Sequence, residues 1–179
     1  MPQYTMDMVL EWAKIFPENA DMGDPNGNQA QKKAAKLGGQ ASVNAYFTEQ
    51  SQIDQLLADG LDPRPLKYDR IKEGEEAFGL GKYIKLTRGL DDDIRVFTNK
   101  KGETEVNFGG APKIVDLRDP DNRKMWSYQE DGSVGNGSLA KVNFEVHSEG
   151  AGVRLKNIGI LELVEYEMTE SSSPDWLEV

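Results

Sequence analysis

The chain has 179 residues, no cysteine, a single histidine and a formal net charge of −10. This composition excludes disulfide bonds, thiolate catalysis and a zinc site built from histidines, and the length suffices for one domain with one hydrophobic core. Neither a signal sequence nor an apolar run of membrane-spanning length is found, so we expect a soluble, intracellular protein with no membrane partner.

Charge is distributed unevenly along the chain. Residues 1–63 carry four Lys and Arg against nine Asp and Glu, residues 64–156 carry seventeen against sixteen, and residues 157–179 carry none against six. The central region is therefore near neutrality, and it can bind an anion if its cations share one face. An acidic surface also serves solubility alone, so the net charge does not identify a partner.

The chain is predicted to begin with a short amphipathic helix. Val9, Trp12 and Phe16 recur at helical spacing within 5–16, and Pro17 ends the pattern. On this interpretation Trp12 is a packing residue.

The next segments are predicted to be a loop, a strand and a second helix. Residues 18–39 are polar and rich in Gly, Asn and Asp, which is typical of a loop. Alternation over 42–47 predicts a strand. The apolar positions within 50–59 predict a short helix, which Gly60 ends.

Four further segments have the period-two pattern of strands. They are Lys82 to Arg88, Ile94 to Thr98, Leu139 to Val146 and Val153 to Tyr166, and Gly159 in the last of them indicates a bulge or a bend. Strands with glycine-rich turns and one or two small helices indicate a mainly β fold, a small β-barrel or a sandwich.

Basic and aromatic residues occur together on the predicted outward faces of these strands. The set is Tyr83 with Lys85, Arg95 with Phe97, and then Lys141, Arg154 and Lys156. Single-stranded nucleic acid needs this combination, because cations follow the phosphates while flat rings stack on unpaired bases. A reader of duplex DNA would instead present a basic helix.

Three other motifs leave alternatives open. Trp126 and Tyr128 could form a further stacking surface, or Trp126 could only cap the core. The sequence 78–82 lacks the residues of a phosphate-binding Walker loop and is interpreted as a turn. The carboxylates of 91–93 could hold Mg²⁺ in a nuclease, although an acidic hairpin tip explains them better.

The C-terminal segment is acidic and ends in a peptide that contains an aromatic residue. Residues 162–179 contain six carboxylates and no Lys or Arg, and the run Ser171-Ser-Ser-Pro174 precedes Trp176. Such a segment is expected to be flexible, and it is either a solvated terminus or a docking peptide for a partner with a basic pocket.

The order of motifs from Arg70 to Tyr166 resembles the T7-type phage single-stranded DNA-binding proteins. The motifs are Gly79-Leu-Gly-Lys-Tyr-Ile-Lys-Leu-Thr-Arg88, Gly109-Gly-Ala-Pro-Lys-Ile-Val-Asp116, Gly135-Asn-Gly-Ser138, Gly152-Val-Arg-Leu155 and Leu161-Glu-Leu-Val-Glu-Tyr166, followed by the acidic tail. The resemblance covers a little over half of the chain. It implies an OB-fold, a five-stranded Greek-key β-barrel, over residues 41–168, with an N-terminal extension over 1–40 and a tail over 169–179.

The same resemblance implies a function without catalysis, metal or cofactor. Such proteins bind single-stranded DNA without regard to sequence during phage DNA replication, recombination and repair, in the cytoplasm of the infected bacterium. Their acidic tail contacts the phage DNA polymerase and helicase-primase, and here the corresponding residues are Asp175, Trp176, Leu177, Glu178 and Val179. Family tails end on an aromatic residue, whereas this chain ends on Val179.

The expected DNA-binding residues follow from the pattern and the resemblance together. Phosphate contacts are expected from Lys85, Arg88, Arg95, Lys113, Lys141, Arg154 and Lys156, and stacking is expected from Tyr83, Phe97 and Trp126. The extension over 1–40 could cover the barrel, pair subunits into a homodimer or touch DNA. The alternative function is that of a phage structural or assembly β-barrel with a docking tail, and RNA remains open as a ligand.

Overall fold

The computed structural model describes residues 3–68, 78–90, 95–98, 101–107, 110–147 and 150–165, with the backbone alone at 95–97 and 105–107. The acidic run over 91–93 and the C-terminal tail lie outside the described residues.

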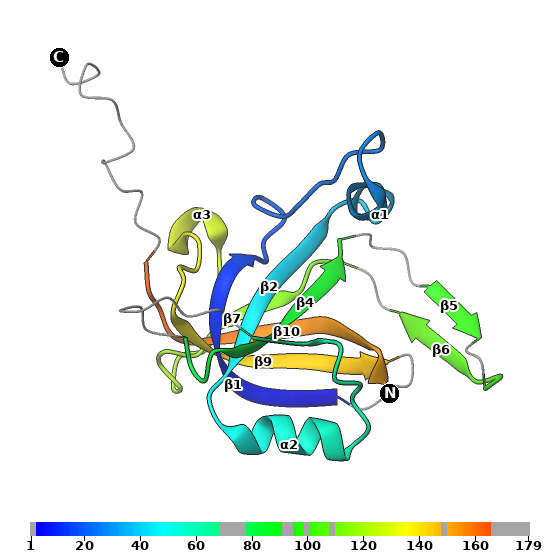
Figure 1. The fold of residues 1–179 in the computed structure, drawn as a ribbon. Helices are drawn as coiled ribbons and strands as arrows, with labels where there is room; N and C mark the ends of the chain where they lie inside the picture. The colour runs from blue at the N-terminus through cyan, green and yellow to red at the C-terminus, as the bar shows by residue number, and fades with distance from the viewer. Residues whose placement is uncertain are drawn as a thin grey trace, which may run out of the picture.

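The fold is mainly β (Figure 1). The strands are β1 Gln3–Lys14, β2 Gln40–Phe47, β3 Leu66–Tyr68, β4 Lys82–Gly89, β5 Arg95–Thr98, β6 Thr104–Asn107, β7 Lys113–Asp116, β8 Lys124–Met125, β9 Ser138–His147 and β10 Gly152–Glu162. The helices are α1 Gln29–Lys36, α2 Gln50–Ala58 and α3 Tyr128–Asp131.

Eight of these strands form one mixed sheet in the order β3-β4-β2-β1-β9-β10-β7-β8. Its neighbours are antiparallel except for β7 and β10, which are parallel. The sheet curves until β10 approaches β4, and α2 lies below β1 and β9 in Figure 1. The remaining strands, β5 and β6, form a separate two-stranded hairpin that projects from the side of the molecule.

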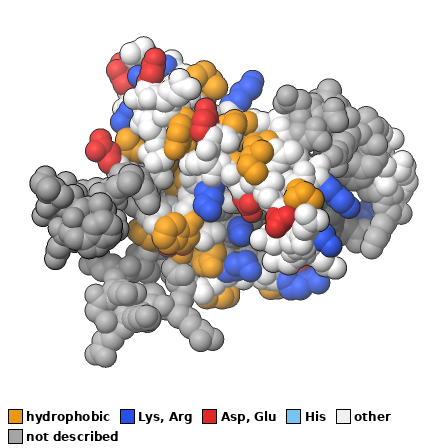
Figure 2. Space-filling model, turned by 90° about the horizontal axis from the view of Figure 1, so that it is seen from above, with side chains coloured by type: hydrophobic (Ala, Val, Ile, Leu, Met, Phe, Trp, Pro, Cys, Tyr) orange, Lys and Arg blue, Asp and Glu red, His pale blue; other side chains and the backbone are white. Residues whose placement is uncertain are grey.

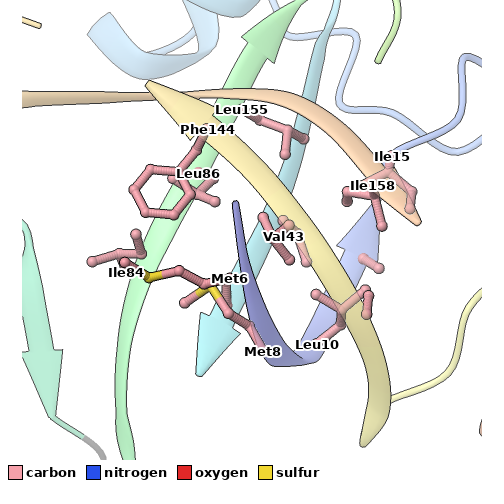
Figure 3. Close-up of a cluster of buried hydrophobic side chains, with 14 of the residues drawn as sticks. Met6, Met8, Leu10, Ile15, Val43, Ile84, Leu86, Phe144, Leu155 and Ile158 are labelled. Carbon is pink, nitrogen blue, oxygen red and sulfur yellow. The ribbon is translucent and has the colours of Figure 1, made fainter. Parts of the chain in front are cut away.

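The hydrophobic core fills the concave side of this curved sheet (Figure 3). Alternate residues of each strand enter it, because successive side chains of a strand point to opposite faces. The fully buried members include Met8, Leu10, Val43, Ile84, Leu86, Phe144, Leu155 and Ile158. Burial of each such side chain contributes roughly 1.5–3 kcal/mol, so the sheet is held mainly by this one core.

The predicted N-terminal helix is wrong. Residues 3–14 form β1, which lies between β2 and β9 in the middle of the sheet. Met6, Met8 and Leu10 alternate into the core, and hydrogen-bonded partners on both edges outweigh the helical spacing that Val9 and Trp12 suggest. The segment is therefore part of the same sheet as residues 40–162 and not a separate extension.

The predicted loop over 18–39 contains a helix that the composition did not indicate. Asn28 caps α1: its side-chain Oδ1 accepts a hydrogen bond from the Gln31 N–H at 2.9 Å, and Gln31 Oε1 accepts one from the Asn28 N–H at 2.9 Å. This reciprocal pair satisfies backbone donors that a helix start leaves open.

The other predicted elements are confirmed in type. The segments expected at 42–47, 82–88 and 139–146 are strands, and strands also occupy 95–98 of the expected 94–98 and 153–162 of the expected 153–166. The segment expected at 50–59 is α2, followed by Gly60 with a φ of 105°. The bulges of β10 lie on either side of Gly159, between Leu155 and Asn157 and between Ile160 and Glu162. Gly159 itself makes room for the side chain of Leu117.

Candidate nucleic-acid interface

The solvent side of β1, β2 and β4 presents three rows of paired residues, which we call the outer face. From β4 through β2 to β1 the rows are Tyr83–Tyr46–Val9, Lys85–Asn44–Glu11 and Thr87–Ser42–Lys14, and β3 extends the first row with Lys67. The opposite side chains of these strands, including Ile84 and Leu86, are in the core. The prediction that Tyr83, Lys85 and Thr87 share the outward side of β4 is therefore confirmed.

Tyr83 is a half-buried ring supported from behind. It stacks on Tyr46 with ring centroids 4.8 Å apart and an angle of 29° between the planes. Tyr46 is fully buried, its hydroxyl donates a hydrogen bond to Glu11 Oε1 at 3.2 Å, and Phe78 packs edge-on against its ring at 5.6 Å. A ring fixed in this way loses little conformational entropy when a second flat group stacks on it.

Exposed lysines lie on the strands that carry the rows. Lys85 and Lys67 are exposed on β4 and β3, and Lys14 is exposed at the end of β1. In the described part of the chain these three ammonium groups form no ion pair. Within the three rows Glu11 supplies the one carboxylate, which also accepts a hydrogen bond from Asn44 Nδ2 at 3.2 Å, and Asp7, on the same side of β1, is paired with Lys141. Long, mobile, unpaired ammonium groups are suited to phosphates.

The helix α1 adds further cations that the sequence interpretation did not include. Lys32, Lys33 and Lys36 are exposed on α1, which is joined to the start of β2 by three residues. They therefore lie beyond the row that contains Ser42 and Lys14. Figure 2, which looks down on the molecule, shows Lys and Arg side chains from the middle to the right of this view, with hydrophobic and some acidic side chains among them.

Trp12 is the most exposed aromatic residue of β1, contrary to its expected packing role. It retains 60% of its accessible surface, whereas Ala13 and Ile15, which follow it, are buried. The sequence signal that could have found it is the pair Glu11 and Lys14 on either side, because charged neighbours within a strand indicate a solvent-facing stretch.

Arg88, Arg154 and Lys156 meet where β4 approaches β10, around one buried carboxylate. Glu145 accepts ionic contacts from Arg154 Nη1 at 3.3 Å and from Lys156 Nζ at 3.7 Å. Arg88 lies on the inward side of β4, and it donates hydrogen bonds to the Gly110 carbonyl at 2.7 Å and to the Lys156 carbonyl at 2.8 Å. The predicted phosphate contact by Arg88 is corrected accordingly: its guanidinium joins two backbone segments.

Burial and neighbouring charges shift the pKa of Arg88. Desolvation lowers the pKa of Arg88, and the positive charge of Arg154 lowers that pKa further, while Glu145 opposes the shift. Three cations around one carboxylate leave this region basic, so Arg154 and Lys156 add positive charge beside the outer face but are oriented by Glu145.

The remaining predicted cations lie apart from Tyr83 and Lys85. Lys141 is on β9, where its ammonium group contacts Asp7 Oδ1 at 3.2 Å, and Lys113 is exposed at the start of β7. Arg95 and Phe97 belong to β5, and their side chains lie outside the described residues, as do Asp175, Trp176, Leu177, Glu178 and Val179.

Trp126 is a core residue, so its predicted stacking role is corrected in favour of the alternative. It is 6% exposed, and its Nε1–H donates to the Gly132 carbonyl at 2.9 Å. The guanidinium of Arg118 lies 5.0 Å from the centre of its ring, held there by two hydrogen bonds to Asp116. An indole with one face under a guanidinium and the rest in the core has no surface left for a base.

Metal and membrane sites were sought in the same residues. Within the described ranges no three His, Asp or Glu side chains are arranged to hold a metal ion. No helix in those ranges has the length and apolar character needed to cross a membrane.

Comparison of the chain with protein-family models, with curated proteins and with solved structures found no match. The functional argument therefore depends on the outer face and on the chemistry of its residues.

Proposed function

We propose that the protein binds single-stranded DNA without regard to sequence, through the outer face of β1, β2 and β4. The observation that carries the proposal is the ring of Tyr83, which stacks on the buried ring of Tyr46. Lys85, two residues further along β4, and Lys67, opposite Tyr83 on β3, carry ammonium groups without an ion pair among the described residues. Such a site offers one hydrophobic plane for a base and two cations for the phosphates on either side of it.

The strand order supports an OB-fold as the scaffold. The strands β1, β2 and β4 form an antiparallel meander, β9 and β10 follow on the other edge of β1, and β10 curves back towards β4. A five-stranded Greek-key barrel has this order, and its second and third strands commonly bind oligonucleotides. Those two strands correspond to β2 and β4, which carry Tyr46, Tyr83 and Lys85.

The acidic C-terminal segment is proposed to bind replication proteins, namely the phage polymerase and helicase-primase that the family resemblance implies. Support comes from its six carboxylates without a compensating cation and from the apolar Trp176 and Leu177 near its end. A phage protein of this kind acts in the cytoplasm of the infected bacterium.

The test is a titration of labelled oligo(dT), an RNA oligonucleotide of equal length and a duplex, each at two salt concentrations. We expect the single strand to bind more tightly than the duplex, with an affinity that falls steeply as salt rises. Absence of oligo(dT) binding at low salt overturns the proposal. Large assemblies without DNA would instead favour the structural or assembly protein.

A further inference from the structure

We infer that Trp12 is a second stacking site for an unpaired nucleobase, and that the turn Gly135-Asn136-Gly137-Ser138 holds it in place. This inference rests on the proposed function and adds to it a residue from the part of the chain for which the family resemblance implies no role. It starts from the backbone of Trp12 and proceeds to its neighbours.

Trp12 has an unfavourable backbone and an unfavourable exposure at the same time. Among the described residues it is the single non-glycine residue with a positive φ, at 51°, in the left-handed region that a Cβ disfavours. Its indole is also 60% exposed to solvent. A residue that is selected for stability alone would be glycine or a small polar residue here, so the indole needs another reason, and strain of this kind collects at functional sites.

A β-bulge turns the indole outward. The partners of β1 on β2 advance from Glu11↔Asn44 to Lys14↔Ser42, so β1 takes three steps where β2 takes two. The extra residue lets Glu11 and Trp12 both lie on the solvent side. Ala13, which is 8% exposed, then returns to the core.

The turn of residues 135–138, which is distant in sequence, holds this bulge through two hydrogen bonds. Asn136 Oδ1 accepts a hydrogen bond from the Trp12 N–H at 2.8 Å, and the Leu10 carbonyl accepts one from the Gly137 N–H at 2.8 Å. The first bond lies within the bulge and the second lies just before it. They satisfy a backbone donor and a backbone acceptor where β1 leaves its ladder with β9.

The turn is itself held rigidly. Ser138 Oγ donates to the Gly135 carbonyl at 2.8 Å and accepts from the Val164 N–H at 2.8 Å. The Gly135 N–H donates to the Val164 carbonyl at 2.8 Å, and a Cβ on Gly135 would collide with that carbonyl oxygen. The glycine, asparagine and serine residues of this motif thus act together to fix the orientation of Trp12.

The neighbours of Trp12 select a nucleobase over a protein surface. Lys14 follows two residues along the same face, and Lys85 lies two strands away in the row of Glu11, a separation of about 10 Å. The Glu11 carboxylate is held by Asn44 and Tyr46. An exposed indole on a face that also carries ammonium groups matches a base with its flanking phosphates, whereas a protein-docking patch would be a continuous apolar area.

Tryptophan fluorescence can test the inference directly in the full chain. With Trp176→Phe as background, Trp12 is the solvent-exposed indole and Trp126 is buried. We expect oligo(dT) to quench this emission, and Trp12→Gly to abolish the quenching and weaken binding about 5- to 150-fold, as for the loss of one stacked base. Glycine suits a positive φ, so this variant should fold, which a thermal melt verifies. An RNA oligonucleotide in a parallel titration shows whether the stacked base must belong to DNA.

Two further variants separate stacking from position and from general exposure. Asn136→Ala releases the Trp12 N–H, and it should reduce the quenching while leaving the salt dependence of binding unchanged. Met125→Ala removes an equally exposed apolar side chain from β8, and it should change neither quantity.

The outcomes distinguish this inference from the proposed function. If the unaltered chain binds no oligonucleotide, the proposed function fails and the stacking site with it. If the chain binds oligo(dT) and Trp12→Gly binds equally well, the stacking site is overturned while the proposed function stands. Unchanged DNA binding together with loss of self-association in Trp12→Gly would also overturn it, in favour of a contact between protein subunits.

Discussion

The ring of Tyr83 lies against the buried ring of Tyr46, with centroids 4.8 Å apart. One surface of Tyr83 is therefore held against the protein, and Lys85 and Lys67 occupy neighbouring exposed positions on β4 and β3. This pair holds the Tyr83 ring in one orientation, which would reduce the entropy lost if a ligand stacked on it.

Replacing Tyr83 by Ala should weaken oligo(dT) binding by roughly 1–3 kcal/mol, because a stacked base loses its platform. Tyr83→Phe should bind almost normally, since stacking uses the ring and not the hydroxyl. Fluorescence anisotropy at fixed salt measures both. Tyr68→Ala is the matched control: Tyr68 is 65% exposed on β3, but Lys67 and not Tyr68 shares the row of Tyr83. Equal losses from Tyr83→Ala and Tyr68→Ala would argue against a specific platform.

Removing the lysines of the outer face should lower the salt dependence of binding. Lys85→Ala and Lys67→Ala should each reduce the slope of log K against log salt by about 0.7, the value for one phosphate contact on a single strand. Lys113→Ala, on β7, should leave the slope nearly unchanged. Titrations at four salt concentrations give these slopes, and a larger effect from Lys113 would move the interface to β7 and β10.

Asp116 should make the stability of the fold depend on pH in acid. Hydrogen bonds from the Arg118 side chain lower the pKa of Asp116, with burial opposing the shift. A carboxyl with a lowered folded-state pKa stabilises the fold above its unfolded pKa, near 4, and this stabilisation is lost as the pH falls through the folded value.

The free energy of unfolding is measured in urea between about pH 2 and pH 7, a range that includes the pKa of an Asp carboxyl in the unfolded chain. Asp116→Asn should cost about 1–2 kcal/mol at pH 7 and little at the acid end, because the partner Arg118 is partly exposed. Asp62→Asn tests the same contact in an exposed loop, where Arg64 binds Asp62 through the same donors. A similar loss in both variants would show that burial of Asp116 and the packing of Arg118 on Trp126 contribute nothing.

Deleting residues 170–179 should raise the affinity for oligo(dT) at low salt, because an acidic segment competes for a basic face. The increase should disappear at high salt, where the competition is screened. The full-length variant Glu170→Gln, Asp175→Asn, Glu178→Gln should reproduce it if charge is the cause. Unchanged affinity in both proteins would contradict the competition.

Much of the fold could be predicted from local patterns, and the failures have a common origin. The strands β2, β4, β9 and β10 alternate apolar and polar residues, so one face of each was evident. In β1 two periods coincide: Met6, Met8 and Leu10 fit a strand, while Val9, Trp12 and Phe16 fit a helix. Hydrogen bonding with β2 and β9 decides between them. Both strands are distant from β1 in the sequence, so a local pattern does not reveal this pairing.

The candidate site was predictable where it depends on alternation along one strand, as for Tyr83 and Lys85. Arg88 alternates in step with Ile84 and Leu86, so the pattern along β4 indicates that it points inward. Its charge nevertheless led to the prediction of a phosphate contact. The exposure of Trp12 depends on Asn136, which lies 124 positions away, and the burial of Trp126 depends on Arg118 and Gly132. Such contacts are set by the fold as a whole.

The left-handed backbone at Trp12 implies a trade-off between stability and activity. Because glycine adopts this conformation without steric penalty, Trp12→Gly should unfold at a temperature equal to or higher than that of the unaltered chain, even as it loses ligand affinity. A search for heat-resistant variants, conducted without a binding assay, would therefore favour the loss of this indole. Its retention would then mark a position where selection has preferred activity to thermal resistance.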